Sequence, residues 1–315
     1  MQFLLVIGGL VVLILGGEFL VRGAVGLALK FNISPLVIGM TVVSFGTSAP
    51  ELLVSLEGAL SGHPDVSVGA VVGSNISNLG LVLGITVIIF PIVVNRDSIR
   101  KDWPIMMFAT LLFYFFAQDE ILEFWEGFIF LTILILFSTW IIIKSRNHGK
   151  KIAAEEEIKE DEVSSSSPKN LFFILLGLVG LYFGAEWLIK GVVSLAETFG
   201  ISEKLVSVSI VAFGTSLPEL VTSAVAAFRK ETDISMGNLI GSNLFNILAI
   251  LGITALVSPL KISQSVNQFD MYFLLGVSLL IFPFMVFGKK IGLWKGVVLV
   301  LYYAVYIYFS ISLEI

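Results

Sequence analysis

The sequence contains no cysteine, and its two histidines, His63 and His148, lie in predicted loops. The absence of cysteine excludes disulfides, thiolate chemistry and cysteine metal sites. No nucleophile–base pair or zinc signature accompanies the histidines, which argues against an enzyme and against any catalytic residue. Charged residues are also scarce, at 14% against about 25% in ordinary soluble domains. We therefore expect neither a soluble protein nor a nucleic-acid partner, and no bound cofactor.

Apolar residues make up 57% of the chain, which indicates a protein that crosses a lipid bilayer many times. A stretch of about 20 apolar residues is long enough to cross about 30 Å of hydrocarbon as a helix. Ten such stretches predict an all-α membrane protein with ten transmembrane helices, near 2–29, 33–60, 66–92, 103–118, 121–143, 170–198, 203–228, 234–258, 269–288 and 291–312.

The second half of the chain repeats two motifs of the first half. The residues at 46–51 read GTSAPE and recur 168 residues later, at 214–219, as GTSLPE. The same offset relates GSNISN at 73–78 to GSNLFN at 241–246. Because the offset is about half the chain length, the repeated unit is half the protein.

This offset divides the chain into three parts: a first five-helix repeat at 1–144, an acidic linker at 145–169 and a second repeat at 170–315. Because each repeat has an odd number of spans, the second repeat has the opposite orientation in the membrane to the first. Such inverted repeats are typical of secondary transporters. If the linker is cytoplasmic, fourteen lysines and arginines lie inside, and two, Lys204 and Lys261, lie outside. This bias predicts both termini outside and the linker in the cytoplasm.

Each first motif belongs to a polar stripe on an otherwise apolar helix. At spacings of three and four the stripe members share one face. In the first half they are Ser44, Thr47, Ser48, Glu51 and Ser55, and in the second half they are Ala212, Thr215, Ser216, Glu219 and Ser223. A carboxylate near the bilayer centre costs about 2.5 to 3.5 kcal/mol, so two of them indicate a function. Helix packing alone accounts for the small residues but not for the glutamates.

Proline within each first motif frees a backbone carbonyl. Pro50 and Pro218 have no N–H, so the helical carbonyls of Gly46 and Gly214 lose their partners. Free carbonyls at membrane depth are tolerated where they line a cavity or coordinate an ion.

The second motifs add hydroxyl and amide oxygens four residues apart, from Ser74, Asn78, Ser242 and Asn246. All of these donors are oxygens, which hard cations prefer. Calcium takes about six to eight oxygens in flexible geometry, and sodium can share them.

The doubled motifs resemble the alpha repeats of the sodium/calcium exchangers, within the cation/calcium antiporter superfamily, and the resemblance covers the whole chain. It implies the exchanger fold and a prokaryotic cell membrane. It also implies calcium binding by Glu51, Glu219, Thr47 and Thr215. The sodium sites it implies comprise Ser48, Ser216, Ser74, Ser242, Ser44, Asn78, Asn246 and the carbonyl of Ala212.

The expected function is antiport of sodium against calcium by alternating access, electrogenic and independent of potassium. Asn246 replaces the aspartate of potassium-dependent relatives, and the proton-coupled branch lacks the Thr-Ser-x-Pro-Glu pattern. A proton- or potassium-coupled cation exchanger of the same fold stays the alternative. A channel is less compatible with an inverted repeat in one chain.

Overall fold

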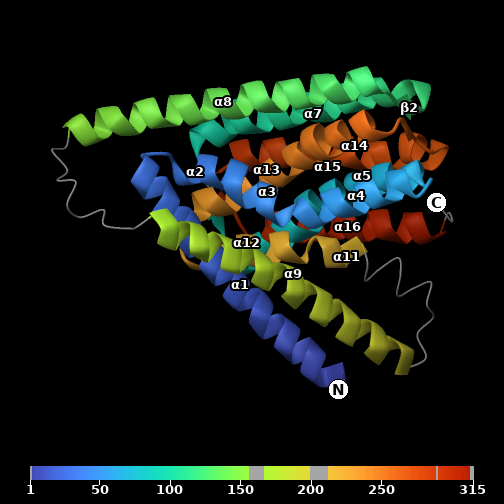
Figure 1. Ribbon diagram of the computed structural model, residues 1–315, viewed down its shortest axis with the longest axis horizontal. Coiled ribbons are helices and arrows are strands. Elements are labelled where there is room, and N and C mark those ends of the chain that lie inside the picture. Colours follow the sequence, from blue (N-terminus) through green and yellow to red (C-terminus); the bar gives the residue numbers. More distant parts are fainter. Residues whose placement is uncertain (1, 156–166, 199–211, 289, 313–315) are drawn as a thin grey trace.

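Figure 1 shows the computed structural model, which describes residues 2–155, 167–198, 212–288 and 290–312. Within these ranges nearly all regular structure is helical, which confirms the all-α class. Seven helices are long and apolar enough to cross a membrane, and the bent pair Pro35–Thr47 and Ala49–Leu60 makes an eighth span if counted as one. The predicted span 203–228 begins outside the described residues, so the count of ten stays a prediction.

The first half of the chain begins with a long helix, α1 (Gln2–Phe31). The second span is broken into α2 (Pro35–Ile38), a π-helical turn η1 (Gly39–Val43), α3 (Ser44–Thr47) and α4 (Ala49–Leu60). The remaining helices are α5 (Pro64–Ser77), η2 (Asn78–Val82), α6 (Leu83–Ile89), η3 (Ser98–Asp102), α7 (Trp103–Phe116), η4 (Ala117–Asp119) and α8 (Phe124–Glu155).

The second half begins with another long helix, α9 (Ser167–Thr198). Its remaining described helices are α11 (Ala212–Thr215), α12 (Leu217–Phe228), α13 (Thr232–Phe245), η7 (Asn246–Leu251), α14 (Gly252–Val257), η8 (Val266–Asp270), α15 (Met271–Val286) and α16 (Leu293–Ser312). Because α8 ends at Glu155 and α9 begins at Ser167, helices enter the predicted linker from both sides.

Local chemistry explains several helix starts. Proline lies in the first turn, where a missing N–H removes no helical hydrogen bond. This applies to α2, α4, α5, α7 and α12. Irregular turns also recur at the repeat offset of 168 residues. One pair of π-helical turns begins at Asn78 and Asn246, and a second pair begins at Ser98 and Val266.

Two short antiparallel ladders join the halves. Strand β1 (Ile92–Val93) pairs with β4 (Lys290–Ile291), and β2 (Ile121–Leu122) pairs with β3 (Leu260–Lys261). Each ladder takes one strand from each half, so the two halves are connected by backbone hydrogen bonds as well as by helix packing.

Helices α1 and α9 form a closely packed pair that lies at an angle to the other helices (Figure 1). Glycine permits the close approach. A Cβ atom on Gly16 would lie 2.7 Å from the backbone nitrogen of Leu181, and one on Gly177 would lie 2.6 Å from that of Leu20. Small residues at such an interface let two membrane helices pack backbone to backbone.

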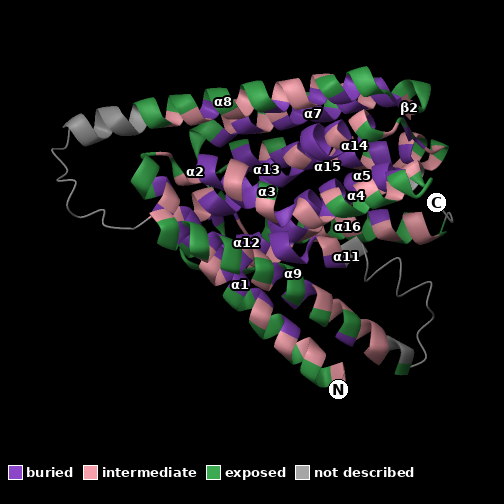
Figure 2. Cartoon of the chain, viewed as in Figure 1, coloured by how far each residue is buried: buried purple, intermediate pink, exposed green. Residues whose placement is uncertain are grey.

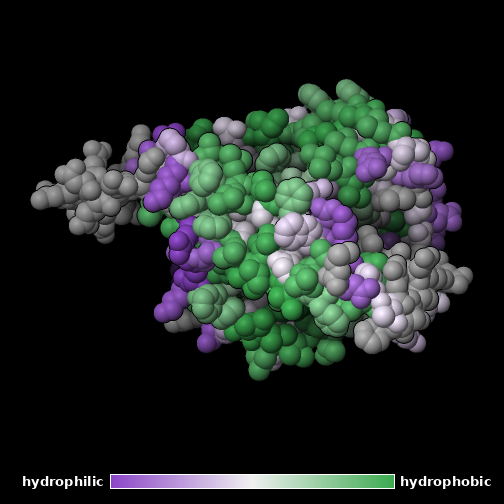
Figure 3. Space-filling view, turned by 60° about the horizontal axis from the view of Figure 1, so that its bottom comes forward, coloured by the Kyte–Doolittle hydropathy of each residue, from purple (hydrophilic) through white to green (hydrophobic). Residues whose placement is uncertain are grey.

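The second motifs lie on the most buried helices. In the apolar segment that runs through α5 and α6, 72% of the residues are buried, and the value is 78% for α13 to α14 but 33% for α1. Figure 2 shows the same contrast, with buried residues in the middle of the bundle and exposed residues on α1, α8 and α9. In Figure 3 hydrophobic side chains cover the middle of the face, with hydrophilic ones toward both ends, as a bilayer requires.

Candidate functional site

Both first motifs interrupt a helix in the same way. Ser48 separates α3 from α4 with φ −87° and ψ 5°, and Ser216 separates α11 from α12 with φ −84° and ψ 2°. The first break bends its span by 46°. Each proline lies directly after the break, in the first turn of the following helix.

The breaks place the two glutamates inside the protein. Glu51 lies in the first turn of α4 and Glu219 in the first turn of α12, with 3% and 0% of their surfaces exposed. The positive end of a helix dipole favours a carboxylate at that position. Ser48, three residues before Glu51, hydrogen-bonds to Glu219, so the two glutamates lie in the same part of the protein.

Each glutamate accepts a hydrogen bond from a serine of the motifs. Ser48 Oγ donates to Glu219 Oε1 over 3.1 Å, and Ser74 Oγ donates to Glu51 Oε1 over 3.2 Å. The first bond crosses between the repeats and the second stays within one. The Oε2 atoms of both glutamates are buried and have no hydrogen-bond partner among the described residues. Burying a charged oxygen without a partner is costly, so this arrangement is suited to a cation.

The other sequence-predicted residues lie on the same helices. Asn78 and Asn246 are fully buried at the starts of η2 and η7, and their side-chain amides have no partner among the residues that the structure describes. Ser242, one turn before Asn246, is fully buried, and its hydroxyl has no hydrogen-bond partner among the described residues. The hydroxyl of Ser216 is also buried and unbonded within the described ranges.

The remaining predicted residues flank the breaks. Thr47 is buried at the end of α3, whereas Thr215, at the end of α11, is partly buried. Ser44 is fully buried, and its hydroxyl donates to the Thr41 carbonyl over 3.5 Å. Ala212 is the first residue of α11. The sequence-predicted residues therefore lie on α3, α4, α5, α11, α12 and α13, at the breaks formed by Ser48 and Ser216, and on the first residues of η2 and η7.

Sequence reasoning missed Asn238 on α13. It is fully buried, and it hydrogen-bonds to Thr47, Ser223 and the Glu219 carbonyl. Repetition could not reveal it, because its counterpart in the first half is Ala70. Its spacing could have revealed it, since Asn238, Ser242 and Asn246 follow one another at four-residue intervals on one helix face.

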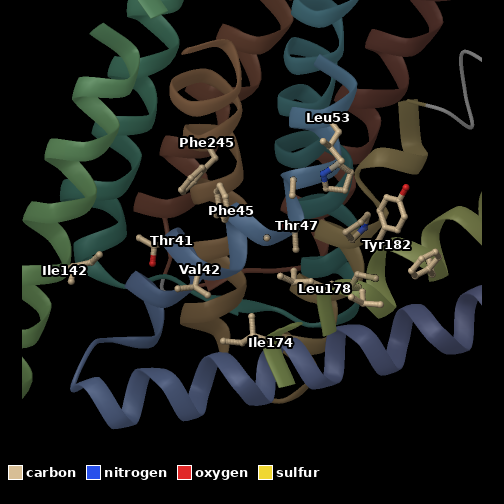
Figure 4. Close-up of a pocket in the computed structure, with 17 residues that line it drawn as sticks. Thr41, Val42, Phe45, Thr47, Leu53, Ile142, Ile174, Leu178, Tyr182 and Phe245 are labelled. Atoms are coloured by element: carbon tan, nitrogen blue, oxygen red, sulfur yellow. The ribbon is translucent and has the colours of Figure 1, made fainter. Parts of the chain in front are cut away.

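An apolar cavity of about 610 Å³ lies beside the breaks (Figure 4). Its lining includes Thr47 and Pro50 of the first break, Pro218 of the second, and Leu178 and Tyr182 of α9. Neither glutamate lines it. The cavity shares Thr47 with the oxygen-rich site but is otherwise lined mainly by apolar side chains.

An all-helical membrane protein with two buried glutamates among hydroxyl and amide oxygens belongs to the class of ion-transporting membrane proteins. The model of the sodium/calcium exchanger protein family matches residues 1–143 and 169–312, and the chain belongs to this family.

Two relatives match over nearly their whole length. The putative antiporter CaxA of Alkalimonas amylolytica is 35% identical over 315 residues, which cover 98% of each chain. The sodium/calcium exchanger MaX1 of Methanosarcina acetivorans is 30% identical over 340 residues, which cover 97% of each. The solved structure of the sodium-calcium exchanger NCX_Mj, soaked with Na⁺ and Ca²⁺, superposes with a TM-score of 0.83 and 31% identity, and the match covers 98% of this chain and 97% of that one. The predicted exchanger fold is confirmed.

Proposed function

We propose that this protein exchanges sodium for calcium across a prokaryotic cell membrane by alternating access. The observation that carries the proposal is the burial of Glu51 and Glu219, one from each repeat, on helices linked by the hydrogen bond from Ser48 to Glu219, with their Oε2 atoms unbonded among the described residues. Two carboxylates neutralise one calcium ion, and the surrounding oxygens supply the rest of its coordination. Membership of the sodium/calcium exchanger family supports sodium and calcium as the two transported ions.

In this proposal the two ions bind neighbouring oxygens and compete through the negative charge of the two carboxylates. Calcium binds Glu51 and Glu219 together with oxygens of Thr47 and Thr215. Sodium binds the flanking oxygens of Ser44, Ser48, Ser74, Ala212, Ser216, Ser242, Asn78 and Asn246. Because Ser48 and Ser74 already contact the carboxylates, a sodium ion at these serines weakens the negative field that calcium requires.

We also propose the topology that the sequence predicts. The repeats at 1–144 and 170–315 have opposite orientations, both termini lie outside, and the linker at 145–169 is cytoplasmic. The lysine and arginine distribution supports this orientation.

Exchange is electrogenic in this proposal. Asn246 is neutral, so the site holds about two negative charges, which one calcium ion matches. Two sodium ions per calcium would make exchange electroneutral, whereas the resemblance to the exchangers implies three, which move one net charge in each cycle. Asn246 also supports independence from potassium. A proton- or potassium-coupled exchanger of the same fold is the competing function.

Calcium uptake into proteoliposomes tests the proposal. Vesicles loaded with sodium and diluted into sodium-free buffer should accumulate calcium, whereas vesicles loaded with potassium or choline should not. A Glu51→Gln protein provides the control for leakage. Uptake driven equally well by a potassium or proton gradient, with sodium absent, would assign the competing function.

A further inference from the structure

A second cavity, of about 910 Å³, lies at the end of the bundle where α8 leaves its predicted span. Its walls are the start of α2, the segment from Asn95 to Asp102, the end of α8 and the start of α13. The start of α2 and the end of α8 lie at the same end of the molecule (Figure 1), and the backbone N–H of Ser34 donates to Ser145 Oγ over 2.7 Å. None of the described residues that line this cavity belongs to the proposed ion site.

The cavity contains charges of both signs that do not all pair with one another. Lys101 forms an ion pair with Asp97, four residues earlier. Lys144, Asp102 and Asp233 also line the cavity, and none of them forms an ion pair among the described residues. One cation and two carboxyl groups are therefore available to a ligand.

Asp102 indicates what kind of group it faces. It is 1% exposed, and its Oδ2 atom has no hydrogen-bond partner within the described ranges. A carboxylate oxygen that is buried without a donor is costly. A metal ion suits the cavity poorly, because in the described part of the chain no three acidic or histidine side chains are grouped to hold one. A primary ammonium supplies both the positive charge and the N–H donors that this oxygen requires.

Lys144 lies at the edge of the membrane. Its side chain is exposed, and its Nζ atom lies 4.7 Å from the centre of the Trp140 ring. Trp140 and Ile143 are also exposed, on the last apolar turns of α8. Tryptophan is enriched where a helix leaves the hydrocarbon, and basic pockets between membrane helices bind lipid head groups. Lys144 is therefore placed to bind the phosphate of a lipid whose chains lie beside α8.

Apolar side chains complete the cavity wall. Leu36 and Val37 of α2 and Ile141 of α8 are buried and line it, together with the exposed Ile143. A cavity with charged groups and an apolar wall suits an amphipathic molecule better than a free, water-soluble solute.

We propose that this cavity binds an aminophospholipid of the phosphatidylethanolamine type, with its phosphate at Lys144, its primary ammonium at Asp102 and Asp233, and its acyl chains against the apolar face of α8. The lipid site is separate from the proposed ion site, and neither assignment depends on the other.

Native mass spectrometry of the delipidated protein in detergent at pH 8 is the test. Burial raises the pKa of Asp102 to about 7, so its carboxyl group is mostly ionised at this pH. Phosphatidylethanolamine, phosphatidylcholine and phosphatidylglycerol with identical acyl chains are added in equal amounts. The protein should retain phosphatidylethanolamine about tenfold more than either other lipid, the effect of about 1.4 kcal/mol.

The three lipids share a phosphate and differ in the group beyond it. Phosphatidylcholine has a quaternary ammonium without N–H donors, and phosphatidylglycerol has no amine. Equal retention of phosphatidylcholine would show that the donors are not recognised, and equal or greater retention of phosphatidylglycerol would show that only the phosphate is bound. Either result would overturn the proposal. Phosphoethanolamine without acyl chains that displaces the lipid at equal concentration would also overturn it, by assigning a soluble ligand.

Variants assign the two ends of the head group. Asp102→Asn should remove the preference for phosphatidylethanolamine over phosphatidylglycerol, and a preference that survives would contradict the ammonium site. Lys144→Gln should lower the retention of both lipids about tenfold. Arg146→Gln, the matched control, changes an exposed residue of α8 outside the cavity lining and should leave both unchanged. The lipid comparison on the unaltered protein decides the proposal even if a variant does not fold.

Discussion

Glu18 on α1 forms an ion pair with Arg229, which directly follows α12, and a second with Arg22 on its own helix over 2.8 Å. Glu186 also forms an ion pair with Lys190 within α9. Among the described residues, the Glu18–Arg229 pair is the one ion pair between residues distant in sequence. It connects the α1–α9 pair to the helix that carries Glu219.

The Glu18–Arg229 pair should stabilise this packing modestly. Both side chains are partly exposed, at 25% and 32%, and such pairs contribute about 0.2 to 1 kcal/mol. A double-mutant cycle of Glu18→Gln and Arg229→Gln, read by thermal unfolding in detergent, should give a coupling energy in this range that shrinks at high salt. Lys190→Gln breaks a pair within one helix and is the matched control. A coupling energy of zero at low salt would show that the contact is not stabilising.

Either carboxamide variant, Glu51→Gln or Glu219→Gln, should abolish calcium transport while leaving the protein folded. A glutamine oxygen still accepts the serine hydrogen bond, but a divalent ion then meets only one negative charge, a loss of several kcal/mol in a buried site. Glu57→Gln, on the exposed face of α4, is the control and should transport normally. Full calcium uptake by either site variant would contradict the assignment.

Asp102 should make the stability of the protein depend on pH. It lies just before α7, outside the predicted span, and burial raises the pKa of its carboxyl group to about 7. The folded protein therefore holds this proton between about pH 4 and pH 7, where the unfolded chain releases it, so stability falls as pH rises through this range. Asp102→Asn should unfold at a higher temperature than the original protein at pH 8, with a smaller difference at pH 5. An equal difference at both pH values would rule out this titration.

Membrane potential should drive calcium movement if three sodium ions exchange for one calcium. With equal sodium on both sides, a positive-inside potential should drive calcium into proteoliposomes, because one net positive charge leaves in each cycle. Each 100 mV supplies about 2.3 kcal/mol for that charge. Vesicles containing the Glu219→Gln protein control for leakage. Calcium movement that ignores the potential would indicate two sodium ions per calcium and electroneutral exchange.

Much of the fold and the site was predictable from local chemistry. Pro50 and Pro218 are compatible with the first turn of a new helix and so favour the breaks at Ser48 and Ser216. The repeat offset aligns the two glutamates with each other. It also aligns Asn78 with Asn246, the residues at which two π-helical turns begin. These features depend on residue identity and on spacing along one helix, which the sequence states directly.

Contacts between helices were not predictable in the same way. Spacing determines which residues share a face, but not how far one helix slides along another. The sequence therefore could not show that Ser48 hydrogen-bonds to Glu219 of the other repeat while Ser74 contacts Glu51 of its own.

The sequence by itself determined an all-helical membrane protein with two matching halves and two glutamates at equivalent positions. Only the tertiary structure decided what the residues that differ between the halves contact. Asn238 corresponds to Ala70 and Arg229 to Ser61, so repetition conceals both residues, and their roles depend on helices that are distant in sequence. The physical reason is that a hydrogen bond or an ion pair requires two groups within about 3 to 4 Å, and that distance is set by helix packing.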